Sequence, residues 1–199
     1  GIKDPYTLNY IINHKNPPKF IGFIANYIKS KRYVNYENLK NLLKVKKKGI
    51  KFVSVLVNPD NKVLNKIKNL NFDYYQLYDV NPIRTKEIKN KYKIKIISAI
   101  TIKNKDDLDK YKAYEKISEI ILFDSIGYEK SLSFNHSIIK NVPNSISRMI
   151  AGNIRYNDRL DKYKKIADII DISGSLETSG SKDISKINTF LENIKKLND

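Results

Sequence analysis

The stretch Lys51-Phe52-Val53-Ser54-Val55-Leu56-Val57 decides the fold. It is short, rich in β-branched residues and almost continuously apolar, and it lies between Gly49 and the turn residues Asn58-Pro59. A strand with one solvent-exposed face alternates apolar and polar side chains, whereas a nearly unbroken apolar run is typical of a parallel strand covered on both faces. We therefore predict a buried strand of a parallel sheet at residues 51–57.

Segments of the same kind recur along the chain, and amphipathic stretches at helical spacing lie between them. The other predicted strands are residues 20–24, 72–77, 94–100, 119–123, 148–151 and 169–173. The last helix has its apolar positions between Ile187 and Leu197, and Asp183 is its expected N-cap. A helix predicted at residues 6–15 precedes the first of these strands, which implies one more strand before it.

This alternation predicts an α/β protein with eight strand–helix units. Eight units in 199 residues indicate a single (β/α)8 TIM-barrel domain over residues 1–199, with its first strand largely missing from the given chain. An open doubly wound sheet is the alternative, but no Gly-x-Gly-x-x-Gly follows any predicted strand.

Composition restricts the class of protein. Hydrophobic residues make up 41% of the chain and charged residues 30%, which is typical of a globular domain. No apolar run approaches the roughly 18 residues of a membrane span, and polar residues interrupt the N-terminus where a signal peptide would need an apolar run. The chain has no cysteine, which excludes disulfides and thiolate metal sites. We expect a cytoplasmic protein that does not interact with membranes.

The positive charge is spread along the chain. Lys and Arg number 38 and Asp and Glu 21, which gives a net charge of +17. Only Lys46-Lys47-Lys48 forms a run, whereas nucleic-acid-binding proteins concentrate their charge beside recognition segments. The accompanying abundance of Asn and Ile indicates a compositional bias. We expect no specific nucleic acid as a partner, but attraction for anionic substrates.

In a TIM barrel the residues that act on the substrate lie at the carboxyl ends of strands. Asp124 directly follows a predicted apolar strand, where apolar surroundings raise the pKa of a carboxyl group and suit a general acid. A helix cap or an ion-paired loop residue is an equally good interpretation of Asp124. Arg32, after the strand at 20–24, has a planar fork that suits a substrate carboxylate, although an exposed Arg is more often a surface group.

Small residues follow the last two predicted strands, at Gly152-Asn153 and Gly174-Ser175. Backbone N–H groups in such loops can approach a phosphate, but ordinary turns are the commoner explanation. His14 and His136 lack a second ligand at metal-binding spacing, so both are interpreted as ordinary polar residues and no metal is predicted. Residues 127–133 are predicted to form a surface loop.

Several motifs occur in the order that a known family has. They are Gly1-Ile2 with Asp4-Pro5, FIGF at 20–23 with SKRYV at 30–34, VSVLVN at 53–58, Gln76-Leu77, LFD at 122–124, and DISGSLE at 171–177 with GSKD at 180–183. This ordered set resembles phosphoribosylanthranilate isomerase, the (β/α)8-barrel enzyme of tryptophan biosynthesis, over nearly the whole chain.

The resemblance implies an Amadori rearrangement of N-(5-phosphoribosyl)anthranilate to 1-(2-carboxyphenylamino)-1-deoxyribulose 5-phosphate, without a cofactor. By matching position, Asp124 is the general acid and Arg32 binds the substrate carboxylate. The phosphate is held by Gly152, Asn153, Gly174 and Ser175. The base of the family is a Cys immediately before the Gly that matches Gly1. A monomer is expected.

Departures from the family pattern cluster in the loops that face the substrate. Tyr78-Asp79 replaces His-Gly, Phe134-Asn135-His136 replaces Phe-Asp-Trp, and Gly152-Asn153 replaces Gly-Gly. Three functions therefore stay open: an active isomerase whose Cys lies outside the given chain, an isomerase-like barrel that has lost or changed catalysis and only binds a phosphorylated ligand, and a nucleic-acid-associated protein supported by charge alone.

Overall fold

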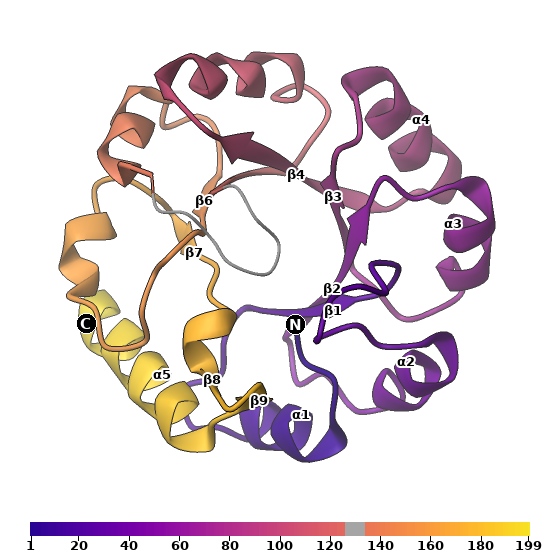
Figure 1. Ribbon diagram of the computed structural model, residues 1–199, viewed down its shortest axis with the longest axis vertical. Coiled ribbons are helices and arrows are strands. Elements are labelled where there is room, and N and C mark those ends of the chain that lie inside the picture. The colour runs from indigo at the N-terminus through magenta and orange to yellow at the C-terminus, as the bar shows by residue number, and fades with distance from the viewer. Residues whose placement is uncertain (126–133) are drawn as a thin grey trace. The chain divides into compact units, whose positions relative to one another are not determined.

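A computed structural model describes residues 1–125 and 134–199 of the chain. The chain divides into two compact units, Gly1–Ile96 and Ile97–Asp199. Each unit is built from parallel strands that are joined by helical connections, as the sequence predicts (Figure 1).

In the first unit, three parallel strands pair in chain order. They are β1 (Phe20–Ile24), β2 (Lys51–Val57) and β3 (Tyr74–Tyr78). Gly22 lies opposite Val53, and Val55 lies opposite Gln76. The helices are α1 (Pro5–Ile12), α2 (Tyr36–Leu42), α3 (Asn61–Ile67) and α4 (Pro82–Tyr92). Helices α2, α3 and α4 lie on the same side of these strands (Figure 1).

The residues before α1 run beside β1. The Ile2 amide donates a hydrogen bond to the Gly22 carbonyl (2.9 Å), and the Ile2 side chain is buried. A β-carbon at Gly1 would lie 3.1 Å from the Ile24 side chain. A strand preceding β1 in a parallel sheet makes this kind of contact. Gly1 and Ile2 therefore lie where the sequence analysis places the end of the barrel's first strand.

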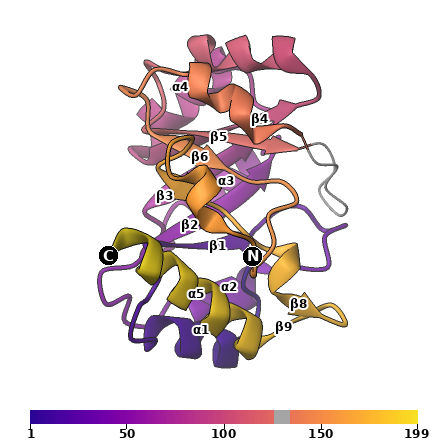
Figure 2. The same ribbon diagram turned by 90° about the vertical axis from the view of Figure 1, so that its left-hand side faces the viewer.

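The second unit contains four parallel strands that also pair in chain order. They are β4 (Lys95–Ile102), β5 (Ile120–Ser125), β6 (Arg148–Ile150) and β7 (Ile169–Ile170). The antiparallel strands β8 (Glu177–Thr178) and β9 (Ser181–Lys182) form a small hairpin before helix α5 (Ile184–Asn198), as Figure 2 shows. The predicted N-cap is confirmed, because the Asp183 carboxylate accepts hydrogen bonds from the amides of Ser185 and Lys186.

The connections of the second unit differ from ordinary α-helices. They contain the 3-10 helices η1 (Lys105–Ala113), η2 (His136–Asn141), η3 (Leu160–Tyr163) and η4 (Gly174–Leu176). Strand β7 is shorter than the predicted 169–173. After Ile170 only one more ladder bond forms, from the Asp171 amide to the Ile150 carbonyl (2.8 Å), and the chain then turns into η4. The loop predicted at 127–133 lies outside the described residues.

Apolar strand residues form the core of each unit. In the first, the fully buried rings of Phe23 and Phe52 meet edge to face with centroids 5.2 Å apart. In the second, Ile121 and Phe123 are buried on β5. Within residues 1–125 and 134–199, none of the helices has the length and apolar character that crossing a membrane requires.

Asp73 fastens the starts of β2 and β3 together. One carboxylate oxygen accepts hydrogen bonds from the Phe52 amide (2.8 Å) and from Lys47 Nζ (2.6 Å). Burial raises the pKa of Asp73, but the hydrogen bonds from Lys47 and Phe52 outweigh it and hold the pKa below the usual 3.8. Lys47, in the middle of the basic run, is thus engaged in an ion pair and is not part of a free charged surface.

Asp73→Ala should lower the free energy of unfolding by about 1–3 kcal/mol at pH 7, because the buried Phe52 amide loses its acceptor. Since the pKa of Asp73 is lower in the folded state, this stabilisation is present above pH 3.8 and is lost as the pH falls through the folded-state pKa. Urea unfolding at several pH values checks both points. Asp109→Ala, at an exposed ion pair with Lys112, is the control and should leave stability unchanged; equal losses for the two variants would contradict the assignment.

Candidate functional site

Three neighbouring strands of the second unit carry the predicted site residues at their carboxyl ends. Asp124 is the penultimate residue of β5, Gly152-Asn153 follow β6, and Gly174-Ser175 follow β7 in helix η4. The ladder continues past β6, since the Ala151 amide donates to the Phe123 carbonyl (2.9 Å). Parallel strands end at a common edge. The second unit therefore brings Asp124 and the four predicted phosphate-binding residues to one edge of its sheet.

The backbone amides of these loops have no hydrogen-bond partner among the described residues. In the part of the chain that the structure describes, the N–H groups of Gly152, Asn153, Gly174 and Ser175 donate no hydrogen bond to the protein. The Tyr156 amide donates to Ser175 Oγ (2.7 Å), which links the two loops and leaves the hydroxyl proton of Ser175 able to donate. Converging unpaired N–H groups are the usual backbone ligands of a phosphate.

Only glycine fits at position 152. Its φ is +89°, in the left-handed region, and it lies directly against β5. A β-carbon there would lie 2.6 Å from Ser125 Oγ and 2.7 Å from Ser125 Cβ, which is closer than real contacts allow. Asn153 also has a positive φ, +52°. Among the described residues, the buried Ser125 Oγ has no hydrogen-bond partner.

Asp124 is half-buried at the end of an apolar strand. Its Oδ1 accepts a hydrogen bond from the Ser125 amide (2.7 Å), and its neighbour across the β4–β5 ladder is Thr101. Phe123, directly before it, is fully buried. The carboxylate thus accepts a hydrogen bond from the adjacent backbone and lies at the same edge as the amides of the predicted phosphate-binding residues.

Arg32 belongs to the first unit and lies in the loop after β1. The Asn26 side chain anchors the start of this loop by two hydrogen bonds to the Val57 backbone, of 2.8 and 2.9 Å. The Val34 amide anchors its end by donating to the last residue of β1 (2.9 Å). In between, the buried Ser30 hydroxyl accepts a hydrogen bond from the Arg32 amide (3.1 Å). The half-buried Arg32 is therefore carried by a loop fixed at both ends.

The two residues that replace His-Gly at the end of β3 keep an ordered backbone. The Tyr78 hydroxyl accepts a hydrogen bond from Gln76 Nε2 (3.2 Å), and both side chains are buried. Asp79 has a φ of +56°, in the region that favours glycine. As at Asn153, the side chain differs from the family pattern while the backbone conformation is one that glycine adopts readily.

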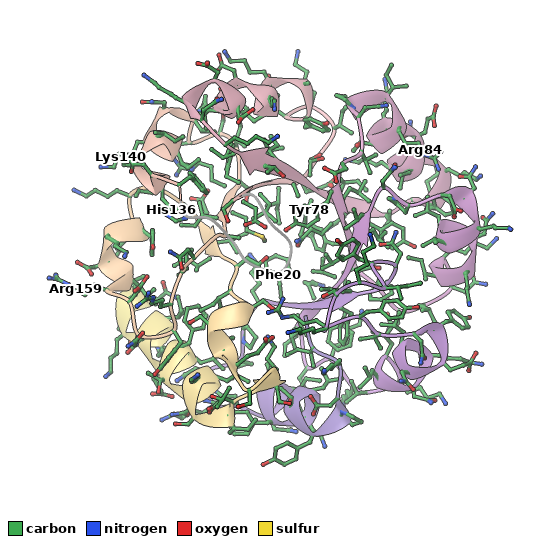
Figure 3. All side chains as sticks on the ribbon, in the orientation of Figure 1. Phe20, Tyr78, Arg84, His136, Lys140 and Arg159 are labelled. Carbon is green, nitrogen blue, oxygen red and sulfur yellow. The ribbon has the colours of Figure 1, made fainter. Side chains whose placement is uncertain are left out.

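Two further residues contact the loops at Gly152-Asn153 and Gly174-Ser175, which are the predicted phosphate loops, and the sequence analysis did not assign them to the site. His136 Nε2 lies 2.9 Å from the Ala151 carbonyl, and burial lowers the pKa of its ring (Figure 3 labels this residue). Lys182 Nζ donates to the Ser173 carbonyl (2.8 Å). The sequence signals that could have indicated these residues are their positions in family motifs. His136 lies in the segment that replaces Phe-Asp-Trp, and Lys182 lies in the GSKD motif. No group of three or more possible metal ligands occurs among the described residues.

Comparison with known proteins gives a consistent result. The family model of N-(5'phosphoribosyl)anthranilate (PRA) isomerase matches residues 4–193. The N-(5'-phosphoribosyl)anthranilate isomerase of Thermoanaerobacter pseudethanolicus is 30% identical over 188 residues, 90% of this chain and 89% of its own. That of Staphylococcus haemolyticus is 31% identical over 189 residues, 88% of this chain and 87% of its own.

Solved structures agree on the fold. Phosphoribosyl anthranilate isomerase from Thermotoga maritima matches with a TM-score of 0.83 at 22% identity, over 98% of this chain and 96% of its own. A phosphoribosyl anthranilate isomerase in complex with reduced 1-(o-carboxyphenylamino)-1-deoxyribulose 5-phosphate matches with a TM-score of 0.83 at 20% identity, over 98% and 95%. These matches confirm the predicted α/β TIM-barrel fold class.

Gly152→Ala should destabilise the protein by about 2–4 kcal/mol, because strain at a positive φ adds to overpacking against Ser125. Gly49→Ala is a matched control, since Gly49 has nearly the same φ (+87°) but a β-carbon added there would meet nothing within 4 Å. It should cost only the backbone strain, about 1–2 kcal/mol. Chemical denaturation of both variants separates the two contributions. Equal losses would show that the contact with Ser125 is unimportant.

Proposed function

Because the chain belongs to the N-(5'-phosphoribosyl)anthranilate isomerase family, we propose that it catalyses the Amadori rearrangement of N-(5-phosphoribosyl)anthranilate in tryptophan biosynthesis. The product is 1-(2-carboxyphenylamino)-1-deoxyribulose 5-phosphate. The observation that carries this proposal is the set of amides after β6 and β7 that have no partner among the described residues, at the same sheet edge as the Asp124 carboxyl group. Such an edge suits a phosphorylated sugar that must receive a proton.

In the proposed reaction, Asp124 is the general acid. It protonates the ring oxygen of the ribofuranose, and the ring opens to a Schiff base. A general base then removes the proton from the adjacent sugar carbon, which gives an enolamine that tautomerises to the ketone. Hydrogen moves only within the substrate and to and from acid and base groups, so the scheme uses no cofactor. In the family, the base is the Cys at the position immediately before Gly1.

The two anionic ends of the substrate would be bound by different chemistry. Arg32 would bind the anthranilate carboxylate through its planar guanidinium, which can donate two parallel hydrogen bonds. The amides of Gly152, Asn153, Gly174 and Ser175 would bind the phosphate. The net charge of +17 supports this assignment by favouring the approach of an anionic substrate.

We further propose that residues 1–199 act as one barrel domain, as a monomer, and in the cytoplasm. The match of one family model to residues 4–193, which include parts of both units, supports a single domain. The alternative function, a barrel that binds a phosphorylated ligand without turning it over, shares the phosphate loops but predicts no product.

Asp124→Asn should reduce kcat about 10²- to 10⁴-fold, the usual contribution of a general acid. The fold should persist, because an amide oxygen at position 124 can still accept the hydrogen bond of the Ser125 amide. Product formation under saturating substrate measures the first effect, and thermal unfolding measures the second. Unaltered turnover in this variant would remove Asp124 from the mechanism.

Arg32→Lys should raise KM about 10- to 100-fold with little change in kcat, because an ammonium group cannot reproduce a bidentate contact and loses about 1.5–3 kcal/mol of binding. Arg84→Lys is the control. Arg84 lies on α4, where it pairs with Glu87 and donates a hydrogen bond to Asn61 Oδ1, and it has no role in the proposed site (Figure 3). Steady-state kinetics should show normal parameters for Arg84→Lys. A normal KM for Arg32→Lys as well would identify Arg32 as an ordinary surface residue.

A further inference from the structure

The two phosphate loops share a feature that lies one residue before each glycine. Ala151 precedes Gly152, and its carbonyl oxygen lies 2.9 Å from His136 Nε2. Ser173 precedes Gly174, and its carbonyl oxygen accepts a hydrogen bond of 2.8 Å from Lys182 Nζ. In both loops a side chain from outside the loop holds the carbonyl that leads into the glycine.

Peptide geometry gives this arrangement a consequence for the amides. The C=O of one residue and the N–H of the next belong to one planar trans peptide and point in opposite directions. A side chain that fixes the Ala151 carbonyl therefore also fixes the direction of the Gly152 N–H, on the opposite side of the peptide. The same holds for the Ser173 carbonyl and the Gly174 N–H, and there the Leu176 amide, which also donates to the Ser173 carbonyl (3.1 Å), holds the peptide together with Lys182. Both N–H groups are among those without a partner in the described part of the chain.

We propose that His136 and Lys182 are positioning residues that turn the N–H groups of Gly152 and Gly174 toward the substrate phosphate. The proposal rests on the function proposed above for its ligand, but its geometry is independent of catalysis. Neither residue touches the reacting atoms. Each acts through the peptide that it holds.

The surroundings of His136 are those of a fixed donor. Its ring centroid lies 4.5 Å from that of Phe134 and 5.4 Å from that of Tyr163, so the imidazole packs against two aromatic rings. Because a carbonyl oxygen only accepts hydrogen bonds, Nε2 carries the proton. The charged groups that face the ring are Lys162 and Asp158, with opposite effects on its pKa, while burial favours the neutral form. The neutral ring already supplies the required donor.

The position of the Lys182 side chain is likewise fixed by several contacts. Its side chain is 5% exposed, and Nζ donates to the Ser173 carbonyl, to Ser173 Oγ (3.1 Å) and to Glu177 Oε1 (2.8 Å). An ammonium group has three protons and no acceptor, so each of these contacts is a hydrogen bond that Lys182 donates. Glu177 is the direct neighbour of Lys182 across the β8–β9 hairpin, so the hairpin returns the chain to the loop that it has just left. A buried ammonium needs such a paired carboxylate to stay charged.

The test for His136 distinguishes the contribution of its N–H donor from that of its aromatic ring. His136→Phe keeps the aromatic packing and removes the donor, whereas His136→Gln removes the ring and keeps an N–H at the position of Nε2. Inorganic phosphate is the probe, and its affinity is measured by calorimetry together with KM and kcat. We expect His136→Phe to weaken phosphate binding and raise KM about tenfold, as expected for the loss of about 1.4 kcal/mol, with kcat changed less than twofold. His136→Gln should recover most of the affinity.

The test for Lys182 separates positioning from an unpaired charge. Lys182→Met leaves the Glu177 carboxylate without its partner, so the double variant Lys182→Met/Glu177→Gln removes both charges. We expect both variants to bind phosphate about tenfold more weakly, and the double variant to recover stability without recovering affinity. Lys195→Met, at an exposed ion pair on α5, is the control and should bind normally. Recovery of phosphate affinity in the double variant would overturn the role of Lys182.

A readout in the unaltered protein covers the case in which a variant does not fold. Added phosphate should shift the amide proton resonances of Gly152 and Gly174 downfield, more than that of Gly49, which has a similar φ far along the chain. Normal phosphate affinity in folded His136→Phe, or an absence of these shifts, would overturn the proposal. Phosphate binding with the expected variant effects but no isomerase product would leave it standing and would instead contradict the proposed reaction.

Discussion

The absence of a β-carbon at Gly152 is the constraint on which the site depends. Because nothing extends from its Cα, the chain leaving β6 can lie directly against Ser125 at the end of β5, beside Asp124. This close approach puts the amides of the β6 loop at the same edge as the carboxyl group. Without a β-carbon at Gly152, side-chain packing does not orient the peptide between Ala151 and Gly152. Its orientation therefore depends on hydrogen bonds, and the Ala151 carbonyl lies within hydrogen-bond distance of His136.

The sequence predicts the strands well where their ends are set by local chemistry. Strands β1 and β2 have the bounds expected from apolar runs flanked by turn residues, Asn16-Pro17-Pro18 before the first and Asn58-Pro59 after the second. Strand β3 begins two residues later than predicted. At Asp73, the carboxylate accepts the hydrogen bond of the Phe52 amide, 21 residues away in sequence. A side chain thus fills the place of a backbone partner, and the strand begins at Tyr74. Hydrophobic periodicity contains no information about such a long-range side-chain contact.

Only those site residues that lie in recognisable motifs or at strand ends were predictable. Asp124 and the small residues after β6 and β7 follow from strand ends and from the order of the family motifs, and the structure gathers them in one unit. The contacts of His136 and Lys182 with these loops were not predictable, although both residues lie in or beside family motifs. A lone histidine has no spacing pattern, and the contact of His136 with Ala151 spans 15 residues and a change of strand. The pairing of Lys182 with Ser173 depends on a hairpin of two-residue strands, which are too short to show a period.

Two of the departures from the family motifs keep a backbone conformation that glycine adopts readily. At Asp79 and Asn153, which replace glycines of the family pattern, φ is still positive, +56° and +52°. This conformation costs an L-residue about 1–2 kcal/mol, and Asp and Asn are the residues that tolerate it best. Lys48, Lys93 and Ser179, which have no role in the proposed site, have similar φ values of +50°, +51° and +51°, so a positive φ alone does not mark a functional loop. A phosphate site made of backbone amides depends on the direction of the N–H groups and hardly on side chains. Asparagine can therefore replace glycine at such a site only if the backbone keeps its conformation. The backbone at Gly152-Asn153 has this conformation, which is the one that the phosphate site proposed above requires.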